Sequence, residues 1–83
     1  MSKDFMVVAV SENTNSFGLK QMVVVAQDGE AYKTCANYLN VKEKGEIITR
    51  VGGMFRGCEL TEKITKMHKS IVREVWSNDF KIA

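Results

Sequence analysis

FMVVAV at residues 5–10 and MVVVA at residues 22–26 are apolar at every position. A strand with one solvated face alternates apolar and polar side chains, so an unbroken apolar strand is one that is covered on both faces. A single amphipathic segment follows much later, near the C-terminus. Because one helix covers only one face of a sheet, we expect the other face to be closed by a barrel, by a second copy of the chain or by a partner.

Turn-forming residues separate these runs from each other and from the next one. Residues 11–18, rich in Ser and Asn, predict a polar loop between two antiparallel strands. Asp28 and Gly29 then predict a two-residue type I′ hairpin, in which both central positions need a positive φ. The strand pairs expected across this hairpin are Val25 with Tyr32 and Val23 with Thr34.

The rest of the chain predicts one or two further strands and a helix. Residues 31–39 fit either a strand or a short helix, and residues 46–51 fit a strand that Gly52 and Gly53 end. From residue 59 to 76 the apolar period changes to that of a helix. The apolar face of this predicted helix carries Leu60, Ile64, Met67, Ile71 and Val75. We therefore expect a single α+β domain over residues 1–83: a four-stranded antiparallel curved sheet, or a small SH3-like or OB-like barrel, with one C-terminal amphipathic helix.

Composition places the chain among ordinary globular domains. It has 83 residues, of which 45% are hydrophobic and 27% charged, so the disordered and fibrous classes are excluded. No apolar run approaches the roughly 20 residues of a membrane helix, and no secretory signal opens the chain, so we expect a cytoplasmic protein without a membrane partner. In a reducing compartment Cys35 and Cys58 are expected to be small buried hydrophobes.

The chain offers no recognisable catalytic set. His68 is its only histidine, and a general acid–base enzyme usually needs such a group in a tuned setting. A structural zinc site needs about four clustered N or S ligands, whereas His68 and the two cysteines supply three. We therefore predict a protein that is not an enzyme and holds no metal or cofactor. A small hydrolase or nuclease built around His68 is the last of three functional hypotheses.

Two segments are candidates for binding a partner protein. The first is the glycine-flanked loop 52–57, whose Met54, Phe55 and Arg56 combine residue types that are enriched at interface hot spots. The second is Phe17, an aromatic residue within the polar loop 11–18. The competing structural interpretations are that Phe55 folds back to plug the end of the sheet and that Phe17 closes the end of a barrel.

A nucleic-acid interface is the alternative binding surface. Residues 1–30 carry two basic and four acidic side chains, and the rest of the chain carries ten basic and six acidic ones. A basic face of the predicted helix could follow a phosphate backbone, and exposed tyrosines could stack on bases. The candidate residues for this interface are Lys63, Lys66, Lys69, Arg73, Tyr32 and Tyr38.

The leading hypothesis is a small non-enzymatic protein that binds another protein as a regulator or inhibitor. Three observations support it: the chain has no recognisable catalytic set, one apolar face of the predicted sheet needs a cover, and the loop at Met54, Phe55 and Arg56 has the residue types of an interface. Compact single-domain proteins of this kind are common among phage-encoded inhibitors of host or defence machinery. A homodimer formed sheet to sheet is a further way to cover the apolar face.

Overall fold

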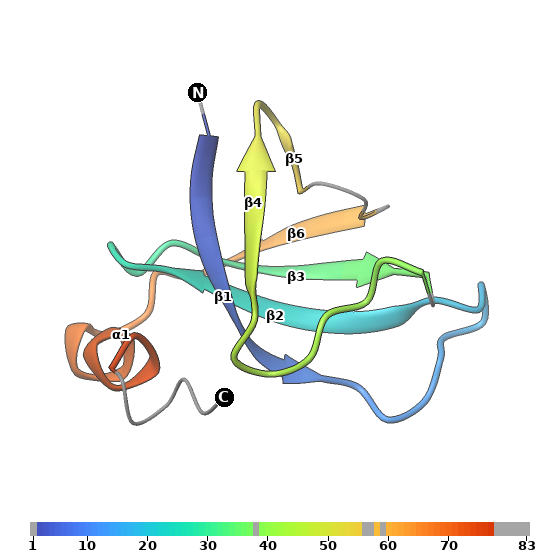
Figure 1. Cartoon of the computed structure of the whole chain (residues 1–83), viewed down its shortest axis with the longest axis horizontal. Helices are drawn as coiled ribbons and strands as arrows, with labels where there is room; N and C mark the ends of the chain where they lie inside the picture. Colours follow the sequence, from blue (N-terminus) through green and yellow to red (C-terminus); the bar gives the residue numbers. More distant parts are fainter. Residues whose placement is uncertain (1, 38, 56–57, 59, 78–83) are drawn as a thin grey trace.

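The computed structural model describes residues 2–37, 39–55, 58 and 60–77. Within them the chain forms six strands followed by one short helix (Figure 1). The elements are β1 (Ser2–Val10), β2 (Lys20–Ala26), β3 (Ala31–Ala36), β4 (Ile47–Val51), β5 (Met54–Phe55), β6 (Leu60–Ile64) and α1 (Lys69–Val75). The segment at 31–39, which fitted a strand or a helix, is thus a strand over its first six residues.

All six strands belong to one antiparallel sheet, in the order β5-β4-β1-β2-β3-β6. The sheet curls into a half-barrel, with β1 and β4 standing across the direction of β2 and β3 (Figure 1). A bulge between Val7 and Ala9 interrupts the β1–β2 register, and such an extra residue bends a strand. The expectation of a curved antiparallel sheet with one C-terminal helix is confirmed, but the expected number of four strands is wrong.

The larger core lies inside the curl. Phe5, Tyr32 and Phe55 pack edge to face there, with ring centroids 4.9–5.7 Å apart. Each such ring pair contributes about 0.5–1.5 kcal/mol beyond the burial of its area. The other buried residues of this cluster are Val7, Met22, Val24, Ala26, Ala36, Ile48 and Cys58.

A second, smaller cluster lies on the other face of the sheet. Val25 and Ala31 pack there against Val72 of α1, and Met67 and Trp76 border the contact. The indole Nε1–H of Trp76 donates to the carbonyl of Val25 at 3.1 Å. The chain therefore covers both faces of β2 by itself, through the curl on one side and α1 on the other, which explains the unbroken apolar run at 22–26.

The β2–β3 hairpin differs from the expected type I′ turn. Gly29 N–H donates to Ala26 O, Ala26 N–H donates to Glu30 O, and among the described residues from 27 to 30 only Gly29 has a positive φ, of 94°. This is a three-residue loop that ends in a glycine bulge. The expected pairs were therefore wrong by one residue, since Val24 pairs with Tyr32 and Val25 with Ala31. A one-residue shift exchanges the two faces of a strand, which turns Tyr32 into the core and Lys33 to solvent.

The expected helix from 59 to 76 is wrong over its first half. Residues Leu60–Ile64 form β6, which pairs with β3, and α1 begins only at Lys69. The spacing of four between Leu60 and Ile64 fits the period of a strand as well as that of a helix. Pairing with β3 satisfies backbone groups that an edge strand would leave open, and this tertiary gain overrides the local helical pattern.

No helix in the described part of the chain is long and apolar enough to cross a membrane.

Candidate interaction surfaces

The β4–β5 hairpin presents two apolar side chains to solvent. Its strands are joined by Gly52 and Gly53, and Gly52 has a φ of 63°, as the first central residue of a type II′ turn requires. Val51 pairs with Met54 directly across this turn. Their side chains are 56% and 63% exposed. The tip of the hairpin is therefore an exposed apolar pair, which we call the hairpin tip (Val51 and Met54).

The next pair along the hairpin, Arg50 with Phe55, points the other way. Phe55 is only 1% exposed and belongs to the aromatic core, so it plugs the sheet as the structural interpretation expected. The alternation of side chains along the two strands explains why neighbouring residues of the predicted site separate. Met54 lies on the surface, and Phe55 anchors the hairpin from below.

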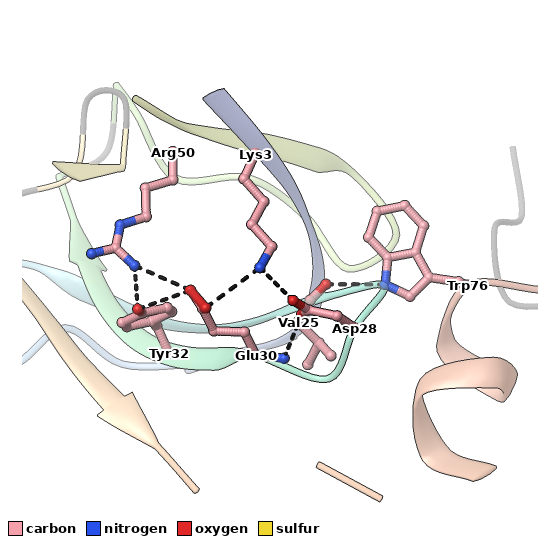
Figure 2. Close-up of polar contacts among 7 residues, drawn as sticks. All are labelled: Lys3, Val25, Asp28, Glu30, Tyr32, Arg50 and Trp76. Carbon is pink, nitrogen blue, oxygen red and sulfur yellow. Dashed lines mark hydrogen bonds and ion pairs between the residues drawn. The ribbon is translucent and has the colours of Figure 1, made fainter. Parts of the chain in front are cut away.

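Arg50 fixes the base of the hairpin to β3 (Figure 2). Its guanidinium lies over the Tyr32 ring at 4.4 Å from the centroid and 3.3 Å from the Glu30 carboxylate. Arg50 also donates to Tyr32 Oη, which in turn donates to Glu30 at 3.0 Å. The guanidinium is thus held by a ring, a hydroxyl and a carboxylate at once, and the hairpin that carries it is anchored through a charged side chain as well as through Phe55.

Lys3 extends this network to the β2–β3 hairpin (Figure 2). Its Nζ lies 2.6 Å from Asp28 and 3.4 Å from Glu30. The hydrogen bond from Lys3 and the one from the backbone N–H of Glu30 hold the pKa of Asp28 below its usual value of 3.8. Burial acts to raise the pKa of Glu30, but the hydrogen bond from Tyr32 and the charge of Lys3 outweigh it and lower that pKa. Neither carboxyl is therefore shifted toward the neutral pH at which a general acid works.

Phe17 sits on a turn that holds it away from the core. Gly18 N–H donates to Asn15 O at 3.0 Å, and the Asn15 side-chain oxygen accepts from the N–H groups of Phe17 and Leu19. Phe17 is 79% exposed, so the interpretation that it closes a barrel end is wrong. A second asparagine, Asn37, braces the turn after β3 in the same way, and Leu39 there is 73% exposed.

The residues proposed for nucleic acid come from several elements, and one of them is buried. Lys63 lies on β6, Lys66 in the following link, and Lys69 and Arg73 on α1. All four are exposed, but Tyr32 is buried at 7% exposure. Tyr38 and Arg56 lie outside the described residues. Lys69 and Arg73 do border a groove of about 590 Å³ between α1 and the β2–β3 hairpin, together with Trp76.

His68 caps a helix, and the two cysteines are buried. The Nδ1 atom of His68 accepts from Ser70 N–H at 3.2 Å, which caps the first turn of α1. Cys35 and Cys58 are both buried thiols, as expected. In the described part of the chain no three His, Cys, Asp or Glu side chains lie close enough together to hold a metal ion.

Of the exposed apolar residues, the sequence predictions named Met54 and Phe17 but not Val51 or Leu39. Val51 could have been found from the Gly52-Gly53 turn, because a two-residue hairpin places the residues on either side of it opposite each other. No protein-family model, curated protein or solved structure matches this chain.

Proposed function

We propose that this protein is a small, non-enzymatic regulator or inhibitor that binds another protein through its hairpin tip. The observation that carries the proposal is the exposed cross-strand pair of Val51 and Met54 on an anchored hairpin. Exposed apolar groups that lie side by side mark interaction sites more often than single ones do. In Figure 1 the turn of the hairpin lies at the rim of the curled sheet, at the end of β4 beside the start of β1, where a partner can reach it.

Anchoring favours binding for an energetic reason. Ordering a flexible side chain or loop at an interface costs about 0.5–1.5 kcal/mol for each rotamer-rich group. Phe55 and Arg50 already fix the base of this hairpin in the unbound chain. Less ordering remains for the moment of association, and more of the contact energy of Val51 and Met54 contributes to affinity. Methionine adds an adaptable surface that fits apolar pockets of different shape.

The proposal is tested by purifying the tagged protein from extract of its host, with nuclease, and comparing it with the variant V51T/M54Q. Thr keeps the β-branch of Val51, and Gln keeps the length of Met54, so the hairpin should still fold. The control is I71Q, which removes an apolar side chain of α1 that is 47% exposed. We expect V51T/M54Q to raise the dissociation constant for the purified partner at least tenfold. I71Q should change that constant by less than twofold. Equal affinities for the three proteins would refute the proposal.

A nucleic-acid-binding module is the second candidate function. The groove bordered by Lys69, Arg73 and Trp76 supports it, because cationic and aromatic side chains together bind single strands. Binding of this kind weakens steeply with salt. The variant K69E/R73E should then abolish retention of an oligonucleotide, and unchanged retention would exclude this groove.

A further inference from the structure

The C-terminal end of β1 has an open edge. β1 pairs with β2 over residues 5–10 but with β4 only over residues 2–6. The loop before β4 extends this contact by one residue, through hydrogen bonds of Val7 with Gly45 and Glu46. Beyond that point, no strand of the described chain pairs with residues 8–10 on the side away from β2.

The main chain of Val10 faces this open side. Ser11 N–H donates to Gln21 O across the β1–β2 ladder. In an antiparallel pair the N–H and C=O groups of successive residues point alternately to the two sides of the strand. Those of Val10 therefore point away from β2, toward the side on which loop 41–44 passes the end of β1 (Figure 1).

A groove of about 480 Å³ lies along this edge, between β1 and loop 41–44. Its floor is apolar and built from Val8, Ala9, Val10 and Val41. Val10 and Val41 also pack against the inner core cluster, and the N–H of Lys42 contacts Met22 Sδ at 3.3 Å. Val10 and Val41 thus join the groove to the inner core, whereas Val8 packs against the smaller cluster on the other face of the sheet.

The rim of the groove is basic. Lys20, Lys42 and Lys44 border it together with one acidic residue, Glu43. The Glu46 carboxylate lies close by, where it accepts from Glu43 N–H at 2.7 Å. Lys20 and Lys42 come from β2 and from the loop, so they approach the groove from two elements. Three lysines and one glutamate thus line the groove beside its apolar residues.

We propose that this groove binds an extended, acidic peptide segment of a partner protein by strand addition to β1. The segment would bond its main chain to Val10, lay an apolar side chain on Val10 and Val41, and place carboxylates near Lys20 and Lys42. Strand addition takes its affinity from main-chain hydrogen bonds and its specificity from side-chain sites along the edge. The site is separate from the hairpin tip, since neither Val51 nor Met54 lines the groove.

The test is selection of a random 12-residue peptide library on the whole protein, followed by affinity measurements with the selected peptides. We expect acidic residues to be enriched around an apolar one. K20E/K42E should weaken binding at least tenfold, while K63E/K69E, with the same change of charge on β6 and α1, should stay within twofold. The bound peptide should also slow amide hydrogen exchange at Val10. V51T/M54Q should bind the peptides like the original chain, which separates this site from the proposed function of the tip.

Several results would overturn the proposal. They are a selection without peptides or without acidic enrichment, equal binding by K20E/K42E, and unchanged exchange at Val10. Binding of a 12-nucleotide thymidine strand that K20E/K42E abolishes, without peptide binding, would assign the lysines to nucleic acid instead.

Discussion

The guanidinium carbon of Arg50 lies 4.4 Å from the centroid of the Tyr32 ring. Arg50 belongs to β4 and Tyr32 to β3, and these strands are not neighbours in the sheet. The contact spans the inside of the curl and joins the β4–β5 hairpin to the opposite wall. The hairpin that carries the hairpin tip is therefore anchored to the core. Substitutions of Arg50 should lower the stability of the whole domain.

Arg50→Ala should lower the free energy of unfolding by about 1–3 kcal/mol. The substitution removes the contact with the Tyr32 ring and leaves the half-buried Glu30 carboxylate without its guanidinium partner. Lys3→Ala is the matched control, because Lys3 is more exposed and exposed ion pairs contribute less than about 1 kcal/mol. Urea denaturation measures both, and an equal loss for the two variants would contradict the role of Arg50.

Substitution of the two phenylalanines proposed as binding residues should affect the stability of the protein to very different extents. Phe55→Ala should cost about 3–5 kcal/mol of stability, because it empties a site in the aromatic core. Phe17→Ala should change stability by less than about 0.5 kcal/mol, since the side chain is 79% exposed. Thermal unfolding followed by circular dichroism distinguishes them. A similar midpoint for the two variants would show that the aromatic cluster contributes little.

Gly29→Ala should destabilise the protein more than Gly45→Ala. Both glycines have a positive φ, 94° and 96°, so each substitution carries the cost of the left-handed conformation, about 1–2 kcal/mol. At Gly29 an added Cβ would also lie 2.9 Å from the carbonyl oxygen of Met67, whereas at Gly45 it meets nothing within 4 Å. The difference in unfolding free energy measures the contact between the β2–β3 hairpin and the link to α1. Equal losses of unfolding free energy for the two variants would indicate that the link to α1 moves aside without a measurable cost.

Stability should fall in acid through Asp28 and Glu30. Both carboxyls have a lowered pKa in the folded state, so the unfolded chain binds more protons as the pH falls below about 4–5. Their contribution is complete above the usual values of 3.8 and 4.5 and is lost as the pH falls through the lowered ones. D28N/E30Q should be less stable at pH 7 and should flatten the dependence of the unfolding free energy on pH between about 2 and 5. An unchanged slope would contradict the assignment.

Sequence patterns predicted what depends on local burial. The apolar run at 22–26 identified a strand covered on both faces, and the curl and α1 supply the two covers. The run at 5–10 is also a strand, but it is fully buried only over residues 5–7. The pattern at 31–39 also became a strand where Tyr32 and Cys35 are buried. These outcomes follow from side chains within one segment, whose periodicity the sequence carries directly.

What the sequence missed depends on pairing between distant segments. The sequence Asp28-Gly29 is compatible with a two-residue turn and with a three-residue loop. The structure has the loop, and its bulge at Gly29 sets the register of Tyr32. Residues 60–64 form the strand β6 because they pair with the edge of β3, although the spacing of Leu60 and Ile64 also fits a helix. The β4–β5 pairing then decided which of Met54 and Phe55 is exposed. In the last two cases a non-local contact selected between two locally acceptable conformations.

Site-specific photocrosslinking from the hairpin tip tests the central claim most directly. A photoreactive amino acid replaces Met54 in one protein and Glu62, an exposed residue of β6, in another, and each is irradiated in extract of the host. We predict a covalent adduct with one protein from position 54 and no such adduct from position 62. A partner that crosslinks from position 62 but not from position 54 would show that binding takes place elsewhere on the sheet, and it would contradict the account.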